Sequence, residues 1–279
     1  MHKLMSASAS GQEVRTALFV PASRVDRARK ALGSDADLVI LDLEDAVASE
    51  DKAAARDKLA ILCEARAAGR IAIRINASGT PWFDADVSAC AALREVAVVM
   101  VPKAESAAQL QAVRAGKPLL PLVETARGLA HLHEIAAAAG VERLAFGSID
   151  LALDLGLHDG GTGAQEMLNQ ARYGIVVHSR AAGIGAPLDG VFAGIADMDG
   201  LARAAQAARG RGFGGMMCIH PAQLETVARA FRPSDAEIAW ATRLLASAAT
   251  SDAGAFAFEG GMVDAPVIAK AQRILGVGG

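Results

Sequence analysis

Eight short apolar segments alternate with segments of helical periodicity along almost the whole chain. The helical segments include residues 24–32, 50–68, 106–115, 128–139, 164–182, 199–211 and 221–230. The apolar segments, which we expect to be strands, are residues 16–20, 38–41, 71–75, 96–101, 119–123, 143–146, 185–191 and 215–219. Eight strands that alternate with helices are typical of a closed α/β barrel. The sequence therefore predicts the α/β class and a (β/α)8 TIM barrel.

An open doubly wound sheet is the competing architecture, and two observations argue against it. Such sheets usually have fewer strands, and their dinucleotide-binding members carry a glycine-rich fingerprint after the first strand. The stretch that follows the first segment here, Val20-Pro21-Ala22-Ser23-Arg24, contains no glycine. A length of 279 residues and an apolar fraction of 52% also suit a barrel with a sizeable core.

Charge and cysteine usage exclude several classes of function. The 28 basic and 31 acidic residues give a net charge of −3, without the basic excess typical of nucleic-acid binding. No apolar run approaches membrane-spanning length, and the first twelve residues lack the apolar region of a signal peptide. Cys63, Cys90 and Cys218 are too few and too scattered for a disulfide framework. We expect a cytoplasmic protein that binds neither nucleic acid nor membrane.

The last part of the chain exceeds what eight strand–helix units need. A helix is predicted at 234–249, followed by a small-residue linker at 250–254. A hairpin-like stretch at 255–262 and a final helix at about 265–275 follow. We therefore expect a flexible N-terminus at 1–13, a catalytic barrel at 14–249, and a C-terminal helical and hairpin appendage at 250–279.

Charged residues stand at or shortly after the carboxyl ends of five of the apolar segments. They are Asp42, Glu44 and Asp45 after the second segment, Arg74 within the third, Lys103 after the fourth, Glu124 after the fifth and Asp150 after the sixth. Charges at the same end of buried strands are costly unless they converge on a partner. In a parallel barrel these ends form one rim, where active sites are built. Several carboxylates with one arginine and one lysine suit a divalent cation and an anionic substrate.

Glu124 and Asp150 are the best candidates for metal ligands. Magnesium typically takes one or two carboxylates together with water and substrate oxygens. The competing explanation is that both residues are helix N-caps or surface carboxylates. The tight turn Phe146-Gly147-Ser148 and the apolar strand before Glu124 favour ligation.

Arg74 lies in a segment that otherwise looks buried, so it needs a partner or a substrate. A buried salt bridge to Glu44 or Asp45 is compatible with substrate contact, and Asn76 follows in the next loop. We expect at least one acid of the Asp42–Asp45 cluster to point into the site, through metal-bound water. The others are expected to cap the next helix.

Lys103 has two competing interpretations, because it is placed either to hold a substrate anion or to pair with Glu105. Arg24, Arg27 and Lys30, after the first strand, form a weak patch for the phosphates of a thioester carrier. Solvated helix charge is the competing explanation for each of these three residues.

Several motifs together resemble the citrate lyase β-subunit-like (CitE-like) branch of the HpcH/HpaI aldolase superfamily. They occur in the family's order and cover about residues 16–275. The motifs are Leu18-Phe19-Val20-Pro21, Ile40-Leu41-Asp42-Leu43-Glu44-Asp45-Ala46-Val47, Arg74-Ile75-Asn76, Val101-Pro102-Lys103, Glu124-Thr125-Ala126, Phe146-Gly147-Ser148-Ile149-Asp150-Leu151, Cys218-Ile219-His220-Pro221 and Gly261-Met262-Val263-Asp264-Ala265-Pro266. The chain departs from the family at Ala22, where glycine is usual, and at Met216, where lysine is usual.

The resemblance implies a Mg²⁺-dependent lyase, with Mn²⁺ as the alternative metal. Such enzymes make or break a C–C bond in 3-hydroxyacyl thioesters such as citryl-, malyl- or citramalyl-CoA, and so have a CoA thioester and a 2-oxo acid as partners. The resemblance makes Glu124 and Asp150 the metal ligands, and Arg74 the group that steadies the enolate. It makes Asp264 an acid that reaches a neighbouring subunit's site, although the sequence alone reads Asp264 as a helix N-cap. That role requires a homo-oligomer of at least two subunits, and the resemblance favours a trimer.

Two other functions remain open at this point. One is an aldolase of the same superfamily that acts on free hydroxy-oxo acids and gives pyruvate. The other is a non-catalytic subunit that binds an acyl carrier partner. Glu44 and Asp45 are expected near the metal through water, and Arg24, Lys30, Asn76 and Lys103 are expected to bind the substrate or its thioester carrier.

Overall fold

Eight parallel strands close into one barrel, which confirms the predicted fold class. The structure is a computed structural model that describes residues 13–64, 70–113, 116–158, 161–251 and 254–277. Each strand pairs with the next in the sequence, and β8 returns to pair with β1. The strands are β1 (Thr16–Pro21), β2 (Leu38–Asp42), β3 (Arg70–Arg74), β4 (Val96–Val101), β5 (Leu119–Val123), β6 (Arg143–Phe146), β7 (Gly185–Asp189) and β8 (Gly215–Cys218).

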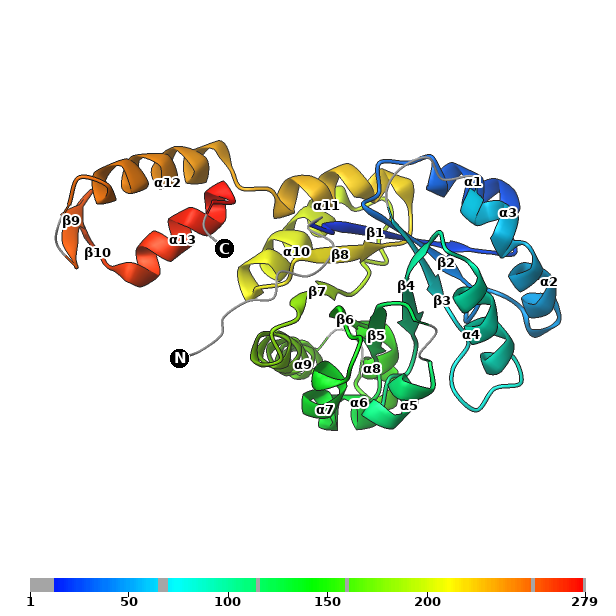
Figure 1. The fold of residues 1–279 in the computed structure, drawn as a ribbon. Helices are drawn as coiled ribbons and strands as arrows, with labels where there is room; N and C mark the ends of the chain where they lie inside the picture. Colours follow the sequence, from blue (N-terminus) through cyan, green and yellow to red (C-terminus); the bar gives the residue numbers. More distant parts are fainter. Residues whose placement is uncertain (1–12, 65–69, 114–115, 159–160, 252–253, 278–279) are drawn as a thin grey trace. The chain divides into compact units, whose positions relative to one another are not determined.

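Helices follow the strands and lie around the outside of the barrel (Figure 1). They are α1 (Val25–Leu32), α2 (Lys52–Asp57), α3 (Leu59–Glu64), α4 (Phe83–Ala92), α5 (Ala107–Ala112), α6 (Ala126–Ala130), α7 (Leu132–Ala137), α8 (Ser148–Asp154), α9 (Thr162–Ala181), α10 (Met198–Arg211) and α11 (Leu224–Phe231). Within the described ranges, none of these helices combines the length and the hydropathy that crossing a bilayer requires.

Two of the predicted helices are interrupted in the structure. The predicted helix at 50–68 divides into α2 and α3 around Lys58, and its last residues lie outside the described part. The predicted helix at 128–139 begins earlier, at Ala126, and divides into α6 and α7 around His131. Thr125 explains the early start, because its side chain accepts a hydrogen bond from the Gly128 amide and caps α6.

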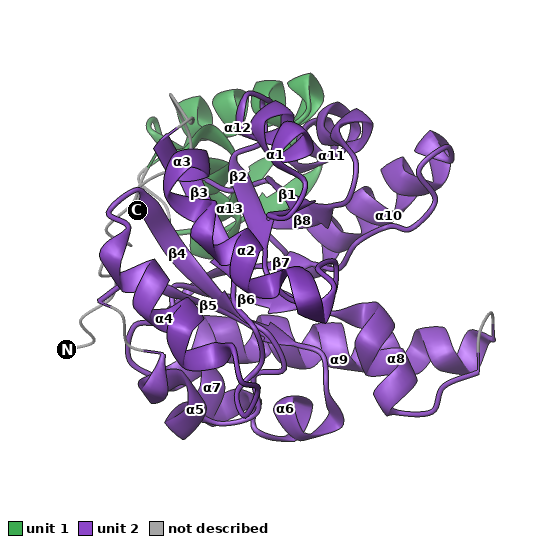
Figure 2. Ribbon diagram, turned by 90° about the vertical axis from the view of Figure 1, so that its right-hand side faces the viewer, with its two compact units in different colours: residues 1–11, 232–279 green, residues 12–231 purple. Residues whose placement is uncertain are grey.

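The chain separates into two compact units (Figure 2). Residues 12–231 form the barrel unit, and the second unit contains the chain from Arg232 onward. The second unit consists of α12 (Asp235–Ala248), the hairpin β9 (Phe256–Phe258) and β10 (Gly261–Val263), and α13 (Ala265–Leu275). The predicted domain boundary at residue 249 assigns α12 to the barrel. In the structure, Ala241 and Leu244 of α12 share a buried cluster with Val263 and Ala271.

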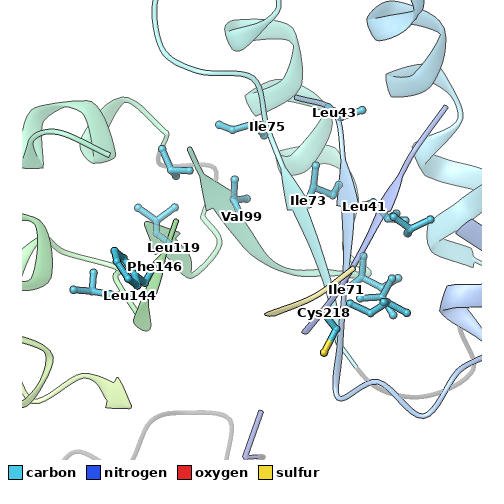
Figure 3. Close-up of a cluster of buried hydrophobic side chains, with 14 of the residues drawn as sticks. Leu41, Leu43, Ile71, Ile73, Ile75, Val99, Leu119, Leu144, Phe146 and Cys218 are labelled. Atoms are coloured by element: carbon cyan, nitrogen blue, oxygen red, sulfur yellow. The ribbon is translucent and has the colours of Figure 1, made fainter. Parts of the chain in front are cut away.

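The barrel has two apolar layers because successive strand residues face opposite sides of the sheet. Leu38 and Ile40 of β2 belong to the cluster inside the barrel, with Leu122 and Met217 from other strands. Leu41, Ile73, Val99 and Phe146 belong to the outer cluster between the strands and the helices, together with the other side chains drawn in Figure 3. Both faces of the strands are therefore buried, which explains their nearly continuous apolar sequences.

An ion pair joins the first residue of β3 to the residue before β6, at the amino-terminal end of the barrel. Arg70, the first residue of β3, donates from Nη1 and Nη2 to the two carboxylate oxygens of Glu142, at 2.7 and 2.6 Å. Both side chains are about one-tenth exposed. Burial alone raises the pKa of Glu142, but the hydrogen bonds and the charge of Arg70 outweigh it and lower the pKa. The bridge therefore stabilises the ionised carboxylate.

Because of this ion pair, we predict that Glu142→Gln is less stable than wild type by an amount that depends on pH. The lowered folded-state pKa means that the stabilisation is present above the ordinary glutamate pKa and is lost as pH falls through the folded value. At pH 7 we expect the variant to lose about 1–3 kcal/mol in the free energy of unfolding. The difference from wild type should shrink in urea titrations at progressively lower pH. Glu95→Gln, at an exposed pair with Arg94, should lose less, and an equal loss at all pH values would contradict the assignment.

Candidate active site

A pocket of about 230 Å³ lies at the carboxyl end of the barrel strands. Its charged lining consists of Asp42, Asp45, Arg74, Glu124 and Asp150. Asp42 and Arg74 are the last residues of β2 and β3, Glu124 follows β5, and Asp150 lies in the first turn of α8. The predicted rim thus brings its principal acids and its arginine into one pocket.

Arg74 is held by a two-pronged contact with Asp42. Its Nε donates to Asp42 Oδ1 and its Nη2 donates to Asp42 Oδ2, each at 2.7 Å. The Phe19 ring lies 4.9 Å from the guanidinium carbon. Burial lowers the pKa of Arg74, but the hydrogen bonds and charge of Asp42, with those of Glu44 and Asp45, outweigh it and raise the pKa. The guanidinium is therefore a fixed positive charge in the pocket.

Glu44 or Asp45 is the predicted partner of Arg74, and Asp42 is not among the predicted partners. The structure places both named acids near Arg74 Nη1, at 3.1 and 3.4 Å, but the two-pronged contact belongs to Asp42. Strand register explains this, because Asp42 and Arg74 are direct partners in the β2–β3 ladder. The Asp42 side chain also lies on the same face of β2 as Leu38 and Ile40, which point into the barrel. Because the residues before Asp42 are all apolar, the sequence does not show which side chains of β2 face into the barrel.

Glu124 is almost fully buried, and one of its oxygens accepts no hydrogen bond from the described residues. Oε1 accepts a hydrogen bond from the Lys103 amide at 2.8 Å. Oε2 has no hydrogen-bond partner among the residues that the structure describes. Burial, with the nearby charges of Glu44 and Asp150, raises the pKa of Glu124 to about 8. A buried oxygen without a partner is costly, so the geometry suits a cation at Oε2.

Glycine at position 147 allows Glu124 to occupy this place. A Cβ at Gly147 would lie 2.5 Å from Glu124 Cβ and 2.7 Å from Oε2. Lys103 contributes a second constraint, because it adopts a φ of 47°, which is unusual for a residue with a side chain. This conformation accompanies the hydrogen bond from its amide to Glu124. Such strain is commonly found where a functional group must be positioned.

The residues present fit a hard divalent cation. Glu124 Oε2 has no hydrogen-bond partner in the part of the chain that the structure describes, and Asp150 lines the same pocket and raises the pKa of Glu124 through its charge. Within the described ranges, no group of three or more His, Cys, Asp or Glu side chains forms a complete cage. Two carboxylates completed by water and substrate oxygens are the usual arrangement for Mg²⁺.

Glu44 and Asp45 occupy different environments, although they are adjacent in sequence. Glu44 is buried, accepts a hydrogen bond from Lys103 Nζ at 2.5 Å, and does not line the pocket. Burial raises its pKa, opposed by Arg74 and Lys103. Asp45 is about half-exposed and lines the pocket. Lys103 pairs with these two acids, whereas the predicted alternative partner, Glu105, has its ion pair with Arg127.

Asn76 belongs to an internal network and does not line the pocket. Its side-chain oxygen accepts a hydrogen bond from Lys52 Nζ at 2.6 Å, and its side-chain nitrogen donates to Asp86 at 2.6 Å. Lys52 also donates to the carbonyls of Leu43 and Glu44. Lys52 is not among the predicted site residues, since a lysine at the start of a helix is usually a solvated charge. The network ties the loop after β2 to the loop after β3.

Of the remaining predicted residues, Arg24 and Lys30 do not line the pocket. Arg24 and Lys30, at the start and in the last turn of α1, are exposed. Asp264, in the second unit, caps α13 through a hydrogen bond from the Val267 amide, which confirms its predicted structural role. The roles of these residues in substrate binding or catalysis stay predictions.

Comparison with known proteins identifies the family. The model of the HpcH/HpaI aldolase/citrate lyase family matches residues 15–221. The chain belongs to this family. The predicted resemblance is confirmed, and the match spans all eight barrel strands.

Three curated relatives from this family align with most of the chain. A citrate lyase subunit beta-like protein of Mycobacterium tuberculosis is 43% identical over 261 residues, covering 92% of this chain and 93% of the relative. A (3S)-malyl-CoA thioesterase of Cereibacter sphaeroides is 38% identical over 240 residues, with 84% and 82% covered. An L-malyl-CoA/beta-methylmalyl-CoA lyase of the same species is 33% identical over 300 residues, with 94% and 93% covered.

Solved structures of CitE from M. tuberculosis share the fold. A complex with magnesium, acetoacetate and coenzyme A superposes with a TM-score of 0.84 at 40% identity, covering 94% of this chain and 97% of the other. A complex with magnesium and pyruvate gives 0.76 at 35%, covering 94% and 98%. A citrate lyase beta subunit complex with oxaloacetate and magnesium gives 0.72 at 38%, covering 79% and 98%.

The close approach of Gly147 predicts that Gly147→Ala disrupts the pocket locally. The added methyl group would displace the Glu124 carboxylate, so we expect affinity for Mg²⁺ or Mn²⁺ to fall about 10- to 100-fold, as is usual when support for a ligand is altered. Isothermal titration with each metal measures this. Gly163→Ala is the matched control, because a Cβ there meets nothing within 4 Å. Unchanged metal affinity in a folded Gly147→Ala protein would contradict the placement of Glu124.

Proposed function

We propose that this protein is a Mg²⁺-dependent carbon–carbon lyase that cleaves 3-hydroxyacyl-CoA thioesters, with citryl-, malyl- and citramalyl-CoA as representative substrates. The observation that carries the proposal is the buried, unpartnered Oε2 of Glu124 in the same pocket as Asp150 and the Asp42-bound Arg74. One pocket thus offers two carboxylates for a metal and one fixed cation for an anionic oxygen.

The relatives support this proposal through the compounds in their names. They include a lyase and a thioesterase for malyl-CoA, and CitE structures with magnesium and coenzyme A. The CitE structures contain pyruvate in one case and oxaloacetate in another. The relatives therefore support the reaction class but do not identify the 2-oxo acid that cleavage releases.

Glu124 and Asp150 would hold the metal, and the bound ion would polarise the oxygens of the carbonyl fragment. Arg74 is placed to stabilise negative charge that develops on the thioester oxygen during cleavage. Asp42 fixes the guanidinium in one orientation before substrate arrives, so little reorganisation is needed during the reaction. A well-placed donor of this kind typically contributes about 3–4 kcal/mol of transition-state stabilisation.

Cleavage requires a base, a bond rearrangement and a proton. A base removes the proton from the 3-hydroxyl group, and the oxygen's electrons form the new carbonyl. The C–C bond breaks, and its electron pair becomes the enolate of the acyl thioester, whose oxygen faces Arg74. The enolate then takes up a proton at its α-carbon, which gives the acyl thioester and the free 2-oxo acid.

The base in this proposal is Asp264 of a neighbouring subunit. The proposal rests on the family's Gly261–Pro266 motif, which this chain carries in full. Within one chain, Asp264 Oδ1 accepts a capping hydrogen bond from the Val267 amide, and the residue is partly exposed. A base supplied in this way requires an oligomer, for which we propose a homotrimer in the cytoplasm.

Removing either metal carboxylate should abolish the reaction and leave the fold intact. In Glu124→Gln and Asp150→Asn, we expect Mg²⁺-dependent cleavage of CoA thioesters to disappear, because an amide is a poor ligand for this ion. Glu166→Gln, at an exposed position on α9, is the matched control and should keep full activity. Cleavage of the C–C bond is monitored through the appearance of the free 2-oxo acid, and circular dichroism checks the fold. Full activity in either site variant would refute the metal assignment.

Subunit mixing tests the shared base. Asp264→Asn and Glu124→Gln should each be inactive alone. Mixed oligomers should recover activity, because some sites would combine an intact Glu124 with an intact Asp264 from a neighbour. Analytical ultracentrifugation of the mixtures verifies assembly. A fully active wild-type monomer, or verified mixed oligomers without recovery, would contradict the shared site.

A further inference from the structure

The loop after β4 reaches Glu124 through a backbone conformation that is unfavourable for most residues. Lys103 has a φ of 47°, in the left-handed region, and its amide donates to Glu124 Oε1 at 2.8 Å. If the chain beyond Lys103 is fixed, relaxation of this φ rotates the preceding peptide group and turns its N–H away from the carboxylate. The hydrogen bond to Glu124 therefore depends on contacts that fix the chain beyond Lys103.

The Gln109 side chain supplies such contacts. Its Nε2 donates to the Lys103 carbonyl at 3.1 Å, and its Oε1 accepts a hydrogen bond from the Glu105 amide at 2.8 Å. The amide of Ala104, between these two residues, donates to the Leu122 carbonyl of β5 at 3.1 Å. The peptide group after Lys103 is thus held at its oxygen by Gln109 and at its nitrogen by the barrel.

These contacts go beyond the capping of a helix. Gln109 lies in the first turn of α5, and its amide donates to the Ser106 side chain, the N-cap, at 3.2 Å. A glutamine at this position usually bonds back to the amide of the cap residue itself. Gln109 instead bonds to the Glu105 amide and the Lys103 carbonyl. A flipped side-chain amide would oppose two donors and two acceptors, so one orientation is favoured.

The side chain of Lys103 does not fix its own backbone in this way. Its ammonium contacts Glu44 Oε1, which restrains the end of a flexible side chain and leaves φ free to change. The other contact to this loop comes from His131, whose Nδ1 lies 2.8 Å from the Glu105 carbonyl. That contact acts two residues beyond Lys103. Of these three side chains, Gln109 is the one that bonds to the Lys103 backbone.

We propose that Gln109 is a positioning residue for the metal centre. It fixes the peptide group after Lys103, which keeps the Lys103 amide on Glu124 Oε1 and leaves Oε2 for the ion. Gln109 does not line the catalytic pocket, and it lies with Lys103 on a second cavity of about 560 Å³. It therefore acts through the loop and not through contact with the ion or substrate. This inference rests on the proposed metal role of Glu124 and names a residue that prepares it.

Metal affinity gives the first test. Gln109→Met removes both side-chain hydrogen bonds and keeps a similar length and helix propensity. We expect the affinity for Mg²⁺ and Mn²⁺, measured by isothermal titration, to fall about 10- to 100-fold, as is usual when the support of a metal ligand is lost. Gln109→Glu lacks the donor for the Lys103 carbonyl and should lose affinity in the same range. Gln111→Met, at an exposed position in the same helix, is the matched control and should bind both metals like wild type.

The Lys103 amide gives a second test that needs no metal. Its exchange with water is measured by NMR in full-length protein labelled with ¹⁵N-lysine, before metal is added, and Lys103→Arg identifies the resonance. We expect exchange at least about tenfold faster in Gln109→Met than in wild type, because the amide loses its hydrogen bond to Glu124. If Gln109 served only to cap α5, its loss would lower the urea midpoint of unfolding and leave both readouts at wild-type values.

The outcomes separate this inference from the proposed function. Wild-type metal affinity or wild-type Lys103 exchange in folded Gln109→Met would overturn the inference and leave the lyase function standing. An equal fall in Gln111→Met would also overturn it. If Gln109→Met does not fold, the same measurements on Gln109→Glu decide. If the wild-type protein cleaves no CoA thioester, the lyase proposal fails, and metal affinity with amide exchange still decides the inference.

Discussion

The contact between Arg74 and Asp42 is the interaction on which the rest of the pocket depends. It joins the last residues of two neighbouring strands, where both side chains face the barrel axis. Removal of two charges from water is costly, and a buried ion pair is rarely the most stable way to fill a core. Its retention at the strand ends is therefore better explained by the need for an oriented, permanently charged guanidinium than by a contribution to stability.

Glu124 shows the same priority of function over stability. Its carboxylate is buried beside other acids, its pKa is raised to about 8, and one oxygen has no described partner. The backbone accommodates this arrangement through a missing side chain at Gly147 and a left-handed conformation at Lys103. Each feature is unfavourable by itself. Together they leave an oxygen that a divalent cation would satisfy.

Much of the barrel could be predicted from the sequence because its strands are buried on both faces. All eight strands match the predicted segments to within two residues at each end. The same property concealed which acid meets Arg74, since a run of uniformly apolar residues gives no indication of which side chains face inward. α8 was also missed, because seven residues are too few to show a helical period. The buried role of Asn76 depends on Lys52 and Asp86, which are distant in sequence.

The network behind the rim explains why adjacent acids have different environments. Lys52 donates to the carbonyls of Leu43 and Glu44, so it holds the chain where β2 becomes a loop. With the backbone fixed there, the Glu44 side chain lies between Arg74 and Lys103, and Asp45 is left at the pocket surface. Glu44 therefore balances cations of the protein itself. Asp45, which is about half-exposed, is the acid of this pair that can respond to a bound ion or substrate.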